Sequence, residues 1–150
     1  QTEEKPTDDN DNIKTIYEQK ISEDLIKMVA LSPEAEKITT DWEAYLAIRT
    51  EVERTLNMTL GEALNNAENM VRISDSLQTK LPDTFQVDQI KARLKLIETQ
   101  AKIQQQLLAR RIEDTVAIKQ SIYKLLQGFN SLNIQINERF IQTPQFIEPQ

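Results

Sequence analysis

Apolar and small residues recur at alternating steps of three and four through the second half of the chain. The members of this series are Val87, Ile90, Leu94, Ile97, Ala101, Leu108, Ile118, Ile122, Leu125, Phe129, Leu132 and Ile136. A three-four repeat sustained over about seven heptads gathers its side chains along one side of a helix. The pattern therefore predicts one long helix from Val87 to about Ile141, with a coiled-coil-like heptad seam.

The first half of the chain carries two further apolar stripes of the same periodicity. Residues 12–31 predict a first helix, and Ser32–Pro33 supplies an N-cap and a proline suited to the first position of a second helix. The seam of the second helix continues unbroken over residues 33–80, which favours one continuous helix. Thr59 and Glu62 have the spacing of a capping box, so a new helix beginning after Thr59 is the alternative.

The segment Leu81–Thr84 is the firmest predicted turn, because Pro82 disfavours helical geometry at the residue before it. A short turn between two long helices makes them antiparallel. Charge favours the same pairing, since residues 13–80 carry eight bases and twelve acids, whereas residues 86–127 carry eight bases and four acids. The predicted class is all-α: an antiparallel helical bundle of three to four helices built on a long helical hairpin.

The two ends of the chain lack this periodicity. Residues 1–12 hold five acids, one base and no apolar side chain, which predicts a disordered acidic leader, either a solubilising tail or a tether. Two prolines predict an extended tail over residues 142–150, which leaves residues 13–141 for the helical bundle. The leader resembles the charged linkers that follow the lipidated cysteine of many bacterial lipoproteins. Because the chain begins with Gln1 and not with methionine, we expect a processed or trimmed form, for which a removed signal peptide is one explanation. The membrane contact would then be a lipid anchor upstream of Gln1, if one is present.

The composition of the chain excludes most common kinds of catalytic and metal-binding site. The chain has no histidine and no cysteine, so catalytic sites that depend on either residue, zinc sites of cysteine and Glu-x-x-His iron sites have no ligands here. Its two glycines are too far apart for a phosphate-binding loop, and a net charge of −6 argues against nucleic acid as a partner. We therefore expect no catalytic residue, no metal ligand and no cofactor, and we expect the protein not to be an enzyme.

Aromatic and polar side chains interrupt the apolar seams at two places. Trp42, Tyr45 and Arg49 follow one face of the second predicted helix, and Gln104 and Arg111 occupy seam positions of the long helix. Core packing is the favoured interpretation of the two aromatic residues, and a solvated face is the favoured interpretation of the polar pair. One alternative places all five around a small-ligand pocket between helices, and another makes the polar pair a buried layer that fixes helix register.

The end of the long predicted helix carries a candidate interaction surface. Its side chains are Phe129, Leu132, Ile136 and Phe140. This part of the seam can extend beyond the hairpin partner, and an exposed apolar face of that kind would bind a protein partner or a second copy of the chain.

These observations favour a non-enzymatic helical interaction or structural module. We expect it to be tethered in a bacterial cell envelope, periplasmic or surface-exposed, and to bind a protein partner or self-associate. One alternative is a sensor-type bundle that binds a small ligand, because the extracellular sensing bundles of bacterial receptors are similar in length and helix content. The other alternative is a cytoplasmic coiled-coil adaptor.

Overall fold

A computed structural model describes residues 17–21, 26–110 and 114–141 of the chain. The fold over these residues is all-α, as the sequence predicts. Its elements are α2 (Pro33–Thr39), α3 (Glu43–Thr55), α4 (Leu60–Asn65), α5 (Ala67–Thr79), the 3₁₀ turn η2 (Asp83–Phe85), α6 (Asp88–Ala109) and α7 (Thr115–Glu138). Within the described ranges the one β-type pairing is an isolated bridge between Lys20 and Thr59.

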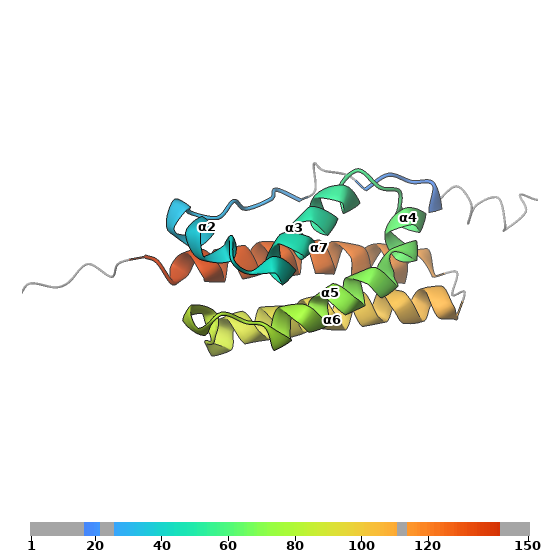
Figure 1. The fold of residues 1–150 in the computed structure, drawn as a ribbon. Coiled ribbons are helices and arrows are strands. Elements are labelled where there is room, and N and C mark those ends of the chain that lie inside the picture. The colour runs from blue at the N-terminus through green and yellow to red at the C-terminus, as the bar shows by residue number, and fades with distance from the viewer. Residues whose placement is uncertain (1–16, 22–25, 111–113, 142–150) are drawn as a thin grey trace, which may run out of the picture.

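Four helices form an elongated antiparallel bundle (Figure 1). The chain runs along α3, reverses through α4 into α5, turns at η2 into α6, and returns along α7. Helix α5 packs on α3 and α6, and α6 packs on α7 along much of their length. Tyr45 of α3 reaches across to Phe129 of α7, where their ring centroids are 5.8 Å apart. The predicted antiparallel bundle, including the turn between α5 and α6, is therefore confirmed.

The region predicted as one long helix is two helices, so that prediction is wrong. Helix α6 ends with Arg110 as its C-cap, and Asp114 caps α7 by accepting a hydrogen bond from the Ala117 amide at 3.0 Å. A single helix of this length would span about 80 Å with one apolar side. Folding it in half lets the two halves of the seam bury each other, at about 1.5–3 kcal/mol for each large apolar side chain.

The interface between α6 and α7 contains a buried polar layer. Gln104 donates a side-chain hydrogen bond to the Ser121 carbonyl at 3.2 Å, and the Ser121 hydroxyl donates to the Gln100 carbonyl at 3.2 Å. All three residues are buried. The solvated-face interpretation is therefore wrong for Gln104, and the alternative of a buried polar layer describes it.

The segment predicted as one helix over residues 33–80 also divides, into α2, α3, α4 and α5. Ser32 caps α2 as predicted. The alternative of a new helix beginning after Thr59 is confirmed, since the Thr59 hydroxyl oxygen caps α4 by accepting from the Glu62 amide at 3.2 Å. The breaks turn α3 back along α5, and the stripes of both helices are buried as a result. One helix over the same residues would extend about 72 Å and leave most of its stripe uncovered.

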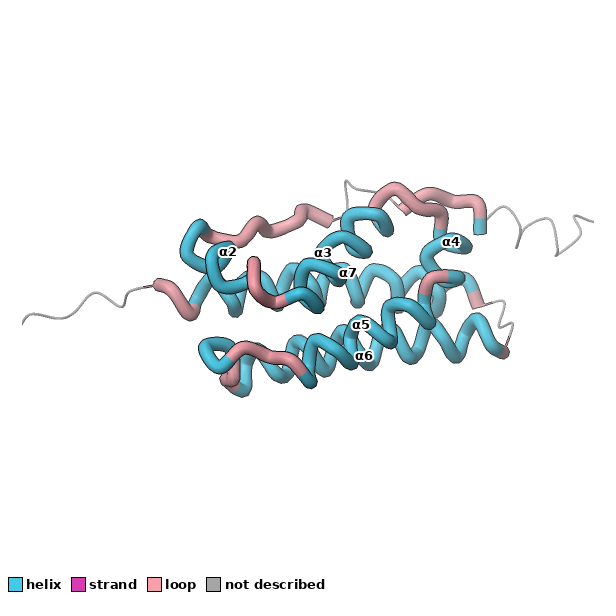
Figure 2. The backbone as a smooth tube through the Cα atoms, viewed as in Figure 1, coloured by secondary structure: helices cyan, strands magenta, loops and turns pink. Residues whose placement is uncertain are grey.

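The predicted helix over residues 12–31 is wrong for residues 18–21 and 26–31, which are not helical. Residues 26–32, called the strap below, form a loop that runs along the bundle beside α7 (Figure 2). Before the strap, the Ile21 amide donates to the Met58 carbonyl at 3.1 Å, which ties this part of the chain to the loop between α3 and α4.

The predicted leader, residues 1–12, and the predicted tail, residues 142–150, lie outside the described residues. Among the helices that are described, none combines the length and the hydropathy needed to cross a membrane.

Candidate functional site

Three asparagines on one face of α7 hold the strap. Asn130, Asn133 and Asn137, called the asparagine ladder below, follow the three-four spacing that aligns side chains along a helix. The Asn130 carboxamide binds the strap backbone twice: its oxygen accepts from the Val29 amide at 2.9 Å, and its nitrogen donates to the Lys27 carbonyl at 2.8 Å. One side chain thus satisfies a donor and an acceptor that a helix or a neighbouring strand would otherwise bind.

Asn137 repeats this arrangement, whereas Asn133 forms one hydrogen bond to the strap backbone. Asn137 accepts from the Ser32 amide at 2.8 Å and donates to the Ala30 carbonyl at 3.0 Å. Asn133 donates to the Val29 carbonyl at 2.9 Å and is buried. The ladder explains why an apolar-periodic segment is not helical here, because α7 supplies partners for its extended backbone.

A pocket of about 260 Å³ lies between the strap, α2, α3 and α7. We call it the strap pocket. Its lining residues are Met28, Val29, Ala30, Leu31, Glu36, Tyr45, Arg49, Glu53, Phe129 and Asn133. At roughly 30 Å³ for each water-sized group, the volume accommodates about nine such groups. The strap forms one wall of the pocket, so the ladder also fixes the shape of the site.

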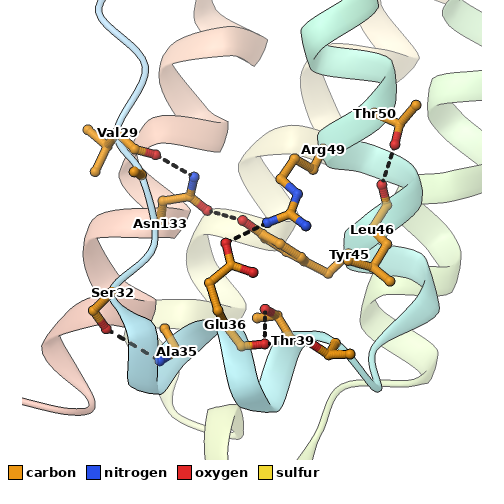
Figure 3. A network of polar contacts seen from close by, with 12 residues as sticks. Val29, Ser32, Ala35, Glu36, Thr39, Tyr45, Leu46, Arg49, Thr50 and Asn133 are labelled. Carbon is orange, nitrogen blue, oxygen red and sulfur yellow. Dashed lines mark hydrogen bonds and ion pairs between the residues drawn. The ribbon is translucent and has the colours of Figure 1, made fainter.

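Four polar side chains of the pocket, those of Glu36, Tyr45, Arg49 and Asn133, form one connected network (Figure 3). The Tyr45 hydroxyl donates to Asn133 Oδ1 at 2.7 Å, and Asn133 in turn holds the strap. Arg49 lies over the Tyr45 ring, with its guanidinium carbon 5.4 Å from the ring centroid. The same guanidinium donates to Glu36 Oε1 at 2.8 Å, which links α3 to α2.

Aromatic rings form the floor of the pocket and the core behind it. Tyr45 stacks on Phe129 and on Trp42, with centroids 5.8 and 5.6 Å apart. Trp42 also contacts Phe85 of η2 at 5.7 Å. The favoured prediction of core packing for Trp42 and Tyr45 is confirmed, since both are buried.

Burial raises the pKa of the Tyr45 hydroxyl far above its usual value, and the nearby Arg49 charge only partly opposes this shift. The hydroxyl therefore stays protonated and acts as a hydrogen-bond donor. Tyr45 is a fixed polar contact in the pocket and has no means of serving as a base near neutral pH.

The structure brings together some of the residues predicted for a pocket and separates others. Tyr45 and Arg49 line the strap pocket. Trp42 lies behind Tyr45 in the core, and Gln104 belongs to the polar layer between α6 and α7. Arg111 lies outside the described residues. Of the five residues predicted for a pocket, only Tyr45 and Arg49 line it. The remaining lining residues come from the strap, α2 and α7, together with Glu53 of α3.

The predicted interaction surface is buried for the most part. Phe129, Leu132 and Ile136 are at most 2% exposed, because α7 packs into the bundle along this face. Phe140 is partly buried and meets Phe85 edge-on, with centroids 6.0 Å apart. The expectation of an exposed apolar face at these residues is therefore wrong.

Sequence reasoning missed the asparagine ladder and the strap. The spacing of Asn130, Asn133 and Asn137 is a detectable signal, because three carboxamides on one helical face have the donors and acceptors to bind a backbone. It did not identify the strap as the bound segment, because the strap lies about 100 residues away in sequence.

Charged groups, aromatic faces and carboxamides at this site are suited to holding a ligand by non-covalent contacts. No group of three metal-binding side chains gathers anywhere in the described part of the chain. No protein-family model matches this sequence, and comparisons with curated proteins and with solved structures found no match.

Proposed function

We propose that this chain is a non-enzymatic binding module and that the strap pocket is its ligand site. The observation that carries the proposal is the half-open pocket of about 260 Å³ lined by the strap, α2, α3 and α7. It combines an apolar body with a few polar groups converging on it, which is the usual composition of a small-molecule site. The ligand is a small molecule with an apolar part against the aromatic floor and a polar part at Arg49, Glu36 and Glu53.

The side chains at the pocket support binding without catalysis. The sequence offers no histidine or cysteine as a base or nucleophile. The Tyr45 hydroxyl is committed to Asn133, and the Arg49 guanidinium is committed to Glu36. A network in which the polar groups already hold one another favours recognition of shape and charge over transfer of a proton or a group.

Thermal unfolding against a panel of small molecules tests this proposal. A ligand at ten times its dissociation constant stabilises the folded state by about 1.4 kcal/mol, which raises the melting temperature of a chain this size by roughly 4 °C. We expect one chemical class in the panel to produce such a shift, measured by circular dichroism.

Two arginine variants of α3 test whether the ligand that raises the melting temperature binds in the strap pocket. Arg49→Met alters the charge at the pocket and should change the ligand-induced shift. Arg54→Met removes the other arginine of α3, which pairs with Glu51 at 2.7 Å away from the pocket, and should leave the shift intact. A panel without any stabilising compound, or a shift that Arg49→Met does not change, contradicts the proposal.

Binding of a protein partner or of a second copy is a second candidate function. Val116 and Ile134 are 64% and 43% exposed and are 18 residues apart, so they lie on the same side of α7. Leu96 of α6 is 43% exposed and lies near Gly128 of α7. Exposed apolar side chains along two adjoining helices favour a contact with another helix.

Sedimentation velocity over a wide concentration range tests self-association through this surface. We expect the average mass to rise with concentration, and the double variant Val116→Glu/Ile134→Glu to remain monomeric. A wild-type protein that stays monomeric throughout removes self-association as the role of these residues.

We also propose a cell-envelope location, supported by the acidic, apolar-free composition of residues 1–12. Mass spectrometry of the N-terminal peptide from the source cells tests it. A diacylated or triacylated cysteine upstream of Gln1 is the expected result. An unmodified sequence that continues upstream to an initiator methionine contradicts the location and favours the cytoplasmic adaptor.

A further inference from the structure

The charges that line the strap pocket are unequal. Two carboxylates, those of Glu36 and Glu53, face one guanidinium, that of Arg49. Arg49 forms its ion pair with Glu36 at 2.8 Å. Glu53 has no ion pair within the part of the chain that the structure describes, and Lys27 of the strap is exposed without lining the pocket. The pocket therefore presents one carboxylate more than its own residues neutralise.

The aromatic floor of the pocket is also suited to a cation. Arg49 already lies over the Tyr45 ring, with the guanidinium carbon 5.4 Å from the centroid, and Phe129 stacks beside Tyr45. The negative face of an aromatic ring attracts a positive group placed above it. Glu53 lines the same pocket as these two rings, so a second positive group bound there would have both a carboxylate and aromatic residues among its surroundings.

We propose that the strap pocket binds a small organic cation: a primary amine joined to an apolar body of about nine non-hydrogen atoms in all. This inference rests on the proposed function of the pocket. The ammonium group pairs with Glu53 at the mouth, and the apolar body packs against Met28, Leu31 and Phe129. A ligand of this size should bind with a dissociation constant on the order of 1 mM.

Three probes that share one apolar body and differ in charge test the inference on the full chain. They are 2-phenylethylamine, 2-phenylethanol and phenylacetate. The fluorescence of Trp42, the single tryptophan, reports occupancy because its ring stacks on Tyr45 at 5.6 Å. We expect the amine to bind about tenfold more tightly than the alcohol, since an ion pair and a cation–π contact are added. Phenylacetate should bind more weakly than the alcohol.

Variants of α3 separate the contribution of each charge. Glu53→Gln should weaken amine binding by about fivefold and leave alcohol binding unchanged. Glu43→Gln makes the same charge change on the same helix, about 15 Å along its axis, and should have little effect. Arg49→Met frees Glu36 and the face of Tyr45, so it should strengthen amine binding.

The outcomes distinguish this inference from the function on which it rests. Binding of the alcohol or phenylacetate as tightly as the amine overturns the cation inference and leaves a ligand-binding pocket in place. Equal amine binding by wild type and Glu53→Gln overturns it as well. No binding of any probe, together with no stabilising compound in the thermal panel, overturns both.

Discussion

Gly128 lies in the interior of α7 at the point where that helix meets α6. An added Cβ would lie 2.7 Å from Leu96 Cδ2 and 3.4 Å from Ile97 Cγ1. Only the first distance is a clash, and it involves the far end of a side chain that is 43% exposed. The helix continues through this position despite the low helix propensity of glycine, because Leu125, Leu126 and Phe129 around it are buried in the bundle.

We predict that Gly128→Ala raises the free energy of unfolding by about 0.5–1 kcal/mol. Alanine favours a helix interior by that amount over glycine, and Leu96 can turn outward to make room. Urea unfolding measures the change. A loss of stability would show that Leu96 is held in place and that the separation of the two helices requires glycine here.

Glu98 of α6 joins α5 to α6 and is the buried acid of the core. Its carboxylate accepts hydrogen bonds from Lys102, at 2.6 Å, and from Gln78 of α5. These bonds hold the pKa of Glu98 below its usual range, the bond from Lys102 having the largest effect. Because the pKa in the folded state lies below that in the unfolded state, the charged carboxylate stabilises the fold above the unfolded pKa.

We predict that Glu98→Gln lowers the unfolding free energy at neutral pH, and that the difference from wild type shrinks as pH falls through the folded pKa of Glu98. Denaturant unfolding between pH 7 and acidic pH measures this. Glu68→Gln, on the exposed side of α5, serves as the control and should follow wild type at each pH. A constant difference across the pH range would contradict the assignment of this stabilisation to the charge of Glu98.

The strap and α7 depend on each other as elements. The strap backbone obtains hydrogen bonds from the asparagine ladder. In return, the strap supplies hydrogen-bond partners for three carboxamides that would otherwise bind water. This pairing holds a non-helical segment against a helix without a β-sheet. It also sets one wall of the strap pocket.

We predict that Asn137→Asp loosens the strap. The aspartate oxygen still accepts from the Ser32 amide, but it no longer donates to the Ala30 carbonyl and places a negative charge beside it. The expected loss is about 1 kcal/mol of unfolding free energy, with faster hydrogen exchange at the strap amides. Gln127→Glu, an exposed site on α7, is the matched control and should leave strap exchange unchanged.

Sequence reasoning succeeded where a helix end is encoded by neighbouring residues. The cap at Ser32 and the turn at Pro82 lie where local chemistry places them, and the helix that begins after Thr59 was the alternative to the favoured continuous helix. It failed where distant packing decides. The break after Ala109 and the non-helical strap both follow from contacts between segments far apart in sequence. In both regions the apolar residues recur with the spacing of a helix, so the sequence pattern alone predicts a helix there.

The same division applies to the candidate site. Tyr45 and Arg49 were identified because an aromatic residue and a cation one turn apart on a helix interrupt an apolar seam. Asn133 and the strap were missed, because their proximity to Tyr45 exists only after α7 has folded back along α3. Phe129 was assigned to an exposed surface because α6 and α7 were predicted as one long helix that extends beyond its partner.

At the scale of the whole molecule, the bundle and the strap have separate roles. The four long helices bury the apolar seams and form a rigid frame. The strap crosses this frame beside α7 and encloses a pocket whose floor is part of the core, through the stacked rings of Tyr45 and Phe129. Ligand binding at that site would therefore change the surroundings of both core residues and strap residues.

The most direct test of the central claim is a map of amide chemical shifts by ¹H–¹⁵N NMR during titration with 2-phenylethylamine. The account predicts saturable shifts at Val29, Ala30, Tyr45 and the Asn133 side-chain amide, with resonances of the outer face of α7 unchanged. Shifts confined to the exposed residues Val116 and Ile134, or no saturable shift, would contradict a ligand site beneath the strap.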